Sequence, residues 1–377
     1  LFADRRIIMR IPKGFYMAGM NCGIKKDKPD IGIIIAEDMA VAAGVFTKSV
    51  NVAYPVTISK KHIVNPIKAI LANSGNANCF WGETKNCIKE NMVILDSVAE
   101  LTGVEASNIL MASTGMIGKP LPKQTVLEQL PLLVEKAYAL HPVAITDFAD
   151  SIMTTDTGNK IAYTKVKVKN GEINVLGIAK GVGMIKPDMA TMLGFILIDA
   201  KLTKMKLKSI LTDAVEDSFN SISVDGCMST NDTVFLLSSN KISIAKDEEN
   251  KIKTAVNEVC LILAKKLIED SEGAQKFITV SVKGAKTKAI AKKAAMAVAC
   301  SDLVKTAIHG QQNNWGRIVA ALGQAGIKVS GPDDIKISGL TTKDVLIEVD
   351  LHNGADSKLV YTCDLTKEYI AINANYN

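Results

Sequence analysis

The sequence is poor in the residues that build metal centres and disulfide frameworks. Only four histidines occur in 377 residues, and they form no group at metal-ligand spacing with one another or with cysteine. The seven cysteines are scattered and odd in number, and no Cys-X-X-Cys pair is present. This usage is typical of reduced thiols in a cytoplasmic protein. We therefore expect no structural or catalytic metal.

Long apolar runs are also missing. The longest, around residues 31–36 and 192–198, have the length of a buried strand, whereas a bilayer span needs roughly 20 residues. The residues after Leu1 do not form the apolar core of a secretory signal. We expect a cytoplasmic protein without a membrane segment.

Strongly basic segments are absent as well. The net charge is +6, but the basic residues are mixed with 39 acidic ones, and aromatic residues make up only 5% of the chain. No dense basic run with interleaved aromatics occurs, so we do not expect nucleic-acid binding. The 47% hydrophobic content supports a sizeable core and excludes a disordered chain.

Two kinds of apolar pattern alternate along the chain. Short β-branched or apolar segments predict strands at residues 31–36, 67–72, 192–198, 233–237 and 277–282. Helical spacing predicts helices over residues 88–101, ending at Gly103, over 207–215, capped by Thr203, and over 252–267. Strands interleaved with helices indicate an α/β protein.

A loop rich in glycine and proline leads into the strand predicted at 192–198. Gly181 and Gly183 do not form a dinucleotide fingerprint, because Lys186 occupies the third glycine position and a strand follows instead of a helix. The Gly-Lys-Ser/Thr ending of a P-loop is missing too. We therefore exclude nucleotide binding by this loop.

Thr191 ends the loop, directly after the small residue Ala190. Alone, it is an ordinary β-branched residue at the start of a strand. A threonine hydroxyl becomes a nucleophile when the free α-amino group of the same residue acts as its base. The α-amino pKa of ~7.7–8.0 leaves a useful neutral fraction. This chemistry requires cleavage of the Ala190–Thr191 bond.

Residues 180–193 resemble the self-cleavage segment of the ArgJ family, the glutamate N-acetyltransferase and ornithine acetyltransferase enzymes of arginine biosynthesis. Other blocks resemble the family in the same order and span nearly the whole chain: Ala72–Asn78, Ser113–Gly118, Met153–Thr157, Ser218–Gly226, Ser229–Thr233, Asn314–Arg317 and Tyr369–Ala374. In the block ending at Arg317 we see no chemistry. For Asp225 and Ser229–Thr233, turn formation is an alternative interpretation.

The resemblance implies an α/β fold like that of DmpA-type aminopeptidases, with packed sheets and outer helices. It also implies self-cleavage into an alpha subunit, residues 1–190, and a beta subunit, residues 191–377, assembled as a heterotetramer of two alpha and two beta subunits.

The resemblance also assigns roles to individual residues. Thr191 is the nucleophile, and Thr114 and Gly115 supply the oxyanion donors. The substrate contacts are Thr154, Lys180, Thr191, Glu272 and Asn373, with the adjacent Thr155 as an alternative to Thr154. Without the resemblance, Thr114-Gly115 would be a tight turn, and Lys180 and Glu272 would be surface charges.

The implied reaction moves acetyl from N-acetylornithine to glutamate through acetyl-Thr191, without a cofactor; acetyl-CoA is a second donor in some family members. One alternative is an acyltransferase or peptidase with another amino-acid substrate. Another is an unprocessed homologue that only binds amino acids. Gln275 and residues 311–313, Gln-Gln-Asn, depart from the family pattern and bear on substrate range.

Overall fold

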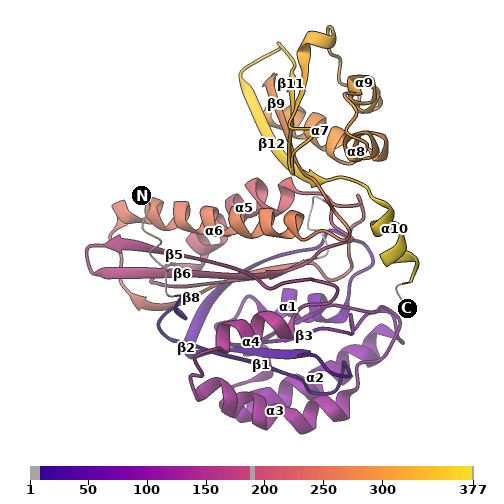
Figure 1. Ribbon diagram of the computed structural model, residues 1–377. Coiled ribbons are helices and arrows are strands. Elements are labelled where there is room, and N and C mark those ends of the chain that lie inside the picture. The colour runs from indigo at the N-terminus through magenta and orange to yellow at the C-terminus, as the bar shows by residue number, and fades with distance from the viewer. Residues whose placement is uncertain (1–8, 187–191, 376–377) are drawn as a thin grey trace.

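The computed structural model describes residues 9–186 and 192–375, which form an eight-stranded and a four-stranded sheet with helices packed outside them (Figure 1). The strands are β1 Phe15–Met20, β2 Ile31–Phe46, β3 Ile67–Asn73, β4 Ile109–Ser113, β5 Lys160–Val168, β6 Gly171–Lys180, β7 Leu193–Ala200, β8 Thr233–Ile242, β9 Phe277–Ala285, β10 Ile335–Ser338, β11 Asp344–Asp350 and β12 Asp356–Cys363. The α-helices are α1 Tyr54–His62, α2 Thr84–Thr102, α3 Lys123–Tyr138, α4 Ala144–Ser151, α5 Lys204–Asp217, α6 Glu249–Glu269, α7 Lys288–Ala299, α8 Asp302–His309, α9 Trp315–Gln324 and α10 Lys367–Ala374.

The long strand β2 belongs to both halves of the larger sheet, whose order is β4-β3-β2-β8-β7-β6-β5, with β1 also paired to β2. Its first part pairs with β3, and its last part, residues 41–46, pairs with β8. Between these parts the register shifts and residues 37–39 are exposed. An irregularity of this kind bends a strand, so β2 joins two half-sheets that face each other.

Apolar side chains on both faces of the half-sheets create a layered core. In β2, Ile33 and Ile35 pack with α2 and α3, whereas Ile34 points into the space between the half-sheets, as the two-residue period of a strand requires. Phe148 and Phe195 meet edge to face in that space. Helices α5 and α6 cover the outer face of β5–β8. The order of layers is helix, sheet, sheet, helix.

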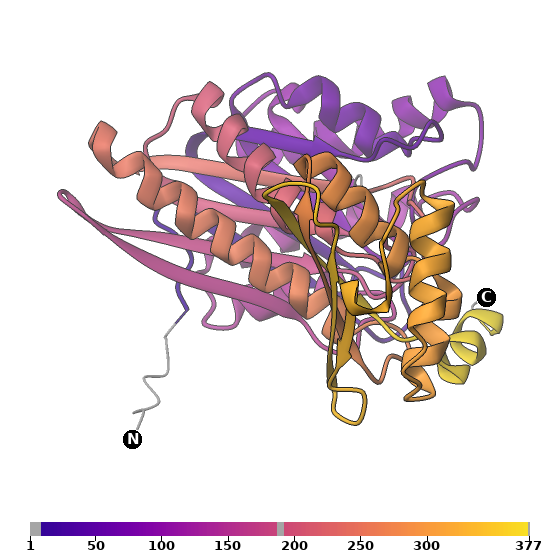
Figure 2. The ribbon, with the colours of Figure 1, turned by 90° about the horizontal axis from the view of Figure 1, so that it is seen from above.

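The four-stranded sheet, β10-β11-β9-β12, forms a smaller lobe with α7, α8 and α9. Helix α6 runs along the body toward this lobe (Figure 2). Helix α10 follows β12 and returns to the body, where the Thr366 hydroxyl donates to the Gly273 carbonyl at 2.8 Å. The C-terminal segment is thereby held beside the end of α6.

The α/β class predicted from the sequence is confirmed, and each predicted strand and helix is present. The strand predicted at residues 31–36 is longer, because it continues past its bend to Phe46. Gly103 adopts a left-handed conformation with φ of 70° at the end of α2, and Thr203 caps α5 by accepting a bond from the Lys206 amide. Over residues 9–186 and 192–375, no helix is both long and apolar enough to cross a membrane.

The predicted boundary between subunits, Ala190–Thr191, lies outside the described residues. The strands on either side of it, β6 and β7, are antiparallel neighbours in one sheet, with Lys180 opposite Leu193. Residues 1–190 and 191–377 therefore contribute to one folded body, and their separation as two subunits stays a prediction.

Candidate active site

A cavity of about 120 Å³ lies where the ends of β4 and β6 meet the segments before β8 and after α6. Its lining comes from well-separated parts of the chain: Ala77, Gly115, Ile117, Thr154, Thr155, Lys180, Val182, Gly183, Met184, Ser229, Thr230, Asn231, Glu272 and Asn373. The structure thus brings Gly115, Thr154, Lys180, Glu272 and Asn373 to one place.

Gly115 follows β4 at a point where two chain segments touch. Its φ is 132°, and a Cβ atom here would lie 2.5 Å from the Asn76 backbone nitrogen. Only glycine tolerates both the positive φ and this close approach. The preceding residue, Thr114, is buried, and its Oγ1 lies 3.1 Å from Lys180 Nζ. Thr114 and Met116 both form bridges to Asn76, so Thr114-Gly115 is held against a neighbouring segment, and Gly115 forms part of the cavity wall.

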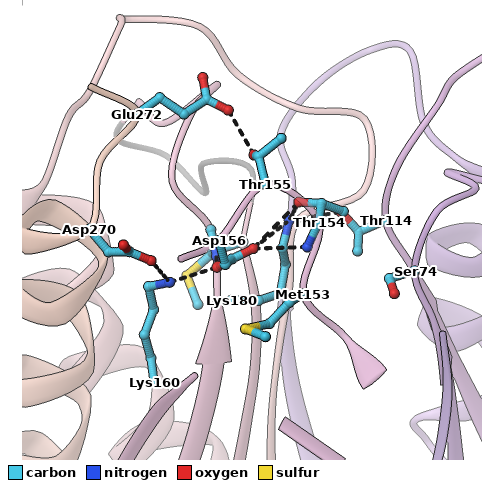
Figure 3. A network of polar contacts seen from close by, with 12 residues as sticks. Ser74, Thr114, Met153, Thr154, Thr155, Asp156, Lys160, Lys180, Asp270 and Glu272 are labelled. Carbon is cyan, nitrogen blue, oxygen red and sulfur yellow. Dashed lines mark hydrogen bonds and ion pairs between the residues drawn. The ribbon is translucent and has the colours of Figure 1, made fainter. Parts of the chain in front are cut away.

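Lys180 is the last residue of β6, and its interpretation as a surface charge is wrong, because it is only 2% exposed. Its ammonium group donates to Thr154 Oγ1 at 2.8 Å and to Thr114 Oγ1 at 3.1 Å (Figure 3). Burial lowers the pKa of Lys180, and the nearby Asp156 carboxylate opposes this effect. The cavity wall thus contains an ammonium group that is held in place by its hydrogen bonds.

Glu272, which follows the end of α6, is partly exposed and lines the same cavity. Thr155 Oγ1 donates to one carboxylate oxygen at 2.7 Å, and Asn373 Nδ2 of α10 donates to the other at 2.9 Å. The backbone beside it is held too, since the Glu272 amide donates to the Val182 carbonyl at 3.0 Å. This carboxylate is therefore oriented by groups from separate segments.

A buried ionic network lies behind Lys180. Asp156 accepts bonds from Lys160 Nζ at 2.7 Å and from the backbone amides of Gly181 at 2.9 Å and Thr154 at 3.0 Å. Lys160 also donates to Asp270 at 2.6 Å. Although burial alone would raise the pKa of Asp156, the charges of Lys180 and Lys160 lower it below its usual range. Asp156 is therefore ionised at neutral pH.

Polar residues before β8 connect the cavity to the surrounding segments. Asn231 Nδ2 donates to the carbonyls of Ala77 at 2.6 Å and Ser113 at 2.9 Å. Asp225 accepts bonds from the amides of Met184 and Ile185 in the glycine-rich loop. These residues do more than form turns, because their hydrogen bonds connect the loops that form the cavity wall.

Thr191 and Ala190, the predicted nucleophile and its cleavage partner, lie outside the described residues. The next residue, Met192, donates its amide to Asp232 Oδ1 at 3.1 Å. Asp232 is fully buried, and burial raises the pKa of its carboxyl group well above the usual value. Met192 is adjacent to Leu193, the register partner of Lys180, so the chain re-enters the described structure close to the cavity.

The network residues Asp156, Lys160 and Asp270 were not predicted from the sequence. Asp156 lies in a block that resembles the family, but nothing in its local pattern shows that it is buried. A weak signal was available, since Asp156 and Lys160 are opposite charges separated by four residues. Asp270 is distant in the sequence, so only tertiary structure could add it.

Within the part of the chain that the structure describes, no group of three or more histidine, cysteine, aspartate or glutamate side chains is placed to hold a metal ion. The cavity instead combines a lysine, a carboxylate and several hydroxyl groups. This set suits recognition of a small molecule that carries both charges.

The family follows from sequence comparison. A profile of the ArgJ family matches residues 16–343 and 336–377. This chain belongs to the ArgJ family. The arginine biosynthesis bifunctional protein ArgJ of Thermotoga neapolitana is 40% identical over 98% of this chain and 100% of that protein. The glutamate N-acetyltransferase of Methanocaldococcus jannaschii is 40% identical over 97% of each chain. The prediction of an acyltransferase of this family is confirmed.

One solved relative in the same family is the ornithine acetyltransferase of Mycobacterium tuberculosis in complex with ornithine. It is 28% identical to this chain, with a TM-score of 0.40, and the match covers 47% of this chain and 92% of that chain.

The departures from the ArgJ pattern lie away from the cavity lining. Gln275 is exposed, and its amide donates to Asp364 at 2.9 Å. Residues 311–313 are exposed in the turn between α8 and α9 of the small lobe. In the next block, Arg317 donates to the Leu303 carbonyl at 2.6 Å, a structural contact within the same lobe. Neither Gln275 nor residues 311–313 line the described cavity.

Proposed function

We propose that this ArgJ-family protein transfers acetyl from N-acetylornithine to glutamate through an acetyl ester on Thr191. The observation that carries the proposal is the convergence of Gly115, Thr154, Lys180 and Glu272 around one cavity, with Thr114 bonded to Lys180 behind it. The resemblance assigns these residues to one reaction, and they lie around one cavity although they come from separate parts of the chain. The name of the Methanocaldococcus jannaschii relative supports the same reaction class.

The charges of the cavity suit an amino-acid substrate. Lys180 can bind a carboxylate, and Glu272 can bind an ammonium group, each by a charge-assisted hydrogen bond. Both N-acetylornithine and glutamate carry a carboxylate, and ornithine adds a cationic side chain. Because the two protein charges are held by neighbours, little ordering is needed when the substrate binds.

The chemistry proceeds in two half-reactions. The Thr191 hydroxyl attacks the acetyl carbonyl, and the α-amino group of Thr191 takes the hydroxyl proton. Thr114 and Gly115 donate to the oxyanion, a term worth about 2.7–4 kcal/mol for each donor. The amide bond breaks, and the proton passes to the departing ornithine amine. The neutral glutamate amine then attacks the ester carbonyl, the bond between the acetyl carbon and the Thr191 oxygen breaks, and a proton from the amine passes through the α-amino group to that oxygen, which regenerates the Thr191 hydroxyl.

The α-amino base requires prior cleavage of the chain. The Thr191 hydroxyl attacks the carbonyl of Ala190, the peptide becomes an ester, and water opens it to free the new N-terminus. The products are residues 1–190 and 191–377, which we propose assemble as a heterotetramer of two alpha and two beta subunits.

The decisive experiment is intact mass spectrometry of the purified protein beside Thr191→Ala. We expect the wild type to give two polypeptides split at Ala190–Thr191 and the variant to remain whole. An uncleaved wild type with full solubility and a folded spectrum would remove the α-amino base, and the interpretation as a binding homologue would replace the enzyme.

Substrate identity needs a second measurement on the cleaved protein. Without glutamate, N-acetylornithine should release a burst of ornithine close to one equivalent of enzyme. Parallel reactions with acetyl-CoA as donor, with other amino-acid acceptors and with short peptides separate the alternatives. Turnover only with a peptide or another acceptor would contradict the proposed substrate pair while keeping the Thr191 mechanism.

A further inference from the structure

Lys180 is a buried cation with other cations around it. The charged or titratable side chains that face it come from separate segments: Lys25, Asp156, Lys160, Asp232 and Glu272. Lys25 donates to the Met153 carbonyl at 2.6 Å, just before the substrate-contact segment. Burial lowers the pKa of Lys25 to about 8. A counter-charge is needed to keep Lys180 charged in this setting.

Of the carboxyl groups that face Lys180, Asp156 is the one suited to supply this charge. Its Oδ2 lies 4.0 Å from Lys180 Nζ, and its side chain is fully buried. Asp232 is a poor counter-charge, because its raised pKa favours the neutral form. Glu272 is nearer to solvent, and both of its oxygens already accept bonds from Thr155 and Asn373.

Asp156 also fixes the backbone on the two segments that hold the Lys180 ammonium group. Its Oδ1 accepts from the Gly181 amide, next to Lys180, and its Oδ2 accepts from the Thr154 amide. Thr154 in turn provides the hydroxyl to which Lys180 donates. Figure 3 shows Asp156 between Lys160 on one side and Thr154 and Lys180 on the other. One carboxylate thus positions both the cation and its acceptor.

We propose that Asp156 is a positioning residue for the reaction: it holds the Lys180 ammonium group and the adjoining backbone in place to receive the substrate carboxylate. Asp156 itself lies behind Lys180, so it acts through that lysine. The inference rests on the proposed function for the identity of the substrate, but the link between Asp156 and Lys180 can be measured without any reaction.

The test uses the full-length protein as purified, with Asp156→Asn, which keeps the shape of the side chain and removes its charge. The titration of the Lys180 amine is followed by NMR of protein with isotope-labelled lysine, and Lys180→Arg assigns the signal. In Asp156→Asn we expect this titration to move to lower pH. The KM for N-acetylornithine should rise about tenfold at neutral pH, the loss expected for one charge-assisted contact, with a smaller change in kcat.

The pH dependence of KM distinguishes a positioning role of Asp156 from a purely structural one. As Lys180 loses its proton it can no longer bind a carboxylate as a cation, so KM rises on the alkaline side. In Asp156→Asn this rise should begin at lower pH than in the wild type. Asp147→Asn is the matched control, because Asp147 also pairs with a lysine, Lys136 at 2.7 Å, away from the cavity. It should leave both the Lys180 titration and the KM profile unchanged.

A second variant guards against failure of Asp156→Asn to fold. Lys160→Met removes a like charge near Lys180, so the Lys180 titration should move to higher pH, opposite to the effect of Asp156→Asn. An unchanged Lys180 titration in whichever variant folds would overturn the proposal, as would a shifted titration with an unchanged KM. If the wild type transfers no acetyl group, the proposed function fails, whereas the Lys180 titration still decides whether Asp156 holds the charge of Lys180.

Discussion

Two clusters of lysine and carboxylate side chains have similar ion-pair distances but differ in how deeply they are buried. The inner cluster comprises Asp156, Lys160, Lys180 and Asp270; Lys160 lies 2.7 Å from Asp156 and 2.6 Å from Asp270. The outer cluster lies between α5, α6 and the small lobe and comprises Lys253–Asp213, Lys292–Glu216 and Lys358–Asp217, with separations of 2.6–2.7 Å. In the inner cluster the Lys160 and Asp156 side chains are 3% and 0% exposed, whereas Glu216 and Asp217 are 48% and 76% exposed.

Similar contacts in the two clusters therefore have different consequences. Water screens the outer pairs, and pairs of this kind contribute about 0–1 kcal/mol. The inner charges have lost their water, so removal of one partner leaves a buried charge unpaired. The inner cluster therefore couples the stability of the fold to the charge state of Lys180 in the cavity wall.

The largest effect expected from breaking the inner cluster is on folding. Asp156→Asn should lower the free energy of unfolding by about 3–5 kcal/mol, because Lys180 and Lys160 lose a buried counter-charge. Denaturant titration measures the change. A loss below about 1 kcal/mol would place the inner cluster in the same class as the outer one.

The effect of Asp156 should also depend on pH. Its pKa is depressed in the folded protein, so its stabilising contribution is present above its unfolded pKa of about 3.9. That contribution is lost as the pH falls below about 5 toward the lower folded pKa. The stability difference between wild type and Asp156→Asn should shrink over this range, and a constant difference would contradict the ionic account.

Thr114→Val tests a neutral neighbour of the inner cluster. It removes the proposed oxyanion hydroxyl, which also contacts Lys180. We expect kcat to fall by about 10²–10³-fold, with little change in KM. Steady-state kinetics on cleaved protein provides the measurement, and an equal fall in substrate affinity would point to binding instead of transition-state stabilisation.

Glu272→Ala changes a partly exposed carboxylate at the cavity and should have an intermediate effect. We expect the KM for N-acetylornithine to rise by about tenfold, the loss of one charge-assisted contact. Glu272→Gln is the control for side-chain shape, since its carbonyl oxygen can still accept the bond from Thr155 while the negative charge is lost. An unchanged KM in both variants would remove Glu272 from the substrate site.

The smallest effect is expected in the outer cluster. Lys292→Ala should change the unfolding free energy by no more than about 0.2–1 kcal/mol and should leave KM unchanged. Thermal unfolding at low and high salt measures it, since salt screens an exposed pair. A loss comparable to that of Asp156→Asn would break the distinction between the two clusters.

Much of the fold could be predicted from the sequence, because local patterns carry the information. The helix stop at Gly103 and the cap at Thr203 follow from backbone chemistry that needs no distant partner. By contrast, β5 and β12 were not predicted. Only one end of each strand is fully buried, and the other end alternates between exposed and partly buried residues. The bend in β2 escaped prediction because residues 37–39 interrupt the strand pattern, although pairing with β8 continues the strand.

The candidate site, like the fold, could be predicted from the sequence only in part. The resemblance supplied Gly115, Thr154, Lys180, Glu272 and Asn373, and the structure places them around one cavity. It could not reveal that Lys180 is buried, because a lysine at the end of a strand is ordinarily exposed. The roles of these residues, and of Thr191, stay predictions for the experiments above.

The α/β class, the family and the residue types available for acyl transfer could be read from the sequence, since these depend on local periodicity and on motifs along the chain. The tertiary structure alone decided which charges lose contact with water and which remain solvated. Burial depends on segments distant in sequence: Asp270 follows α6, Asp156 follows α4, and the two meet only because Lys160 lies between them. The strength of an ionic interaction is set by its surroundings, and the surroundings exist only in the folded protein.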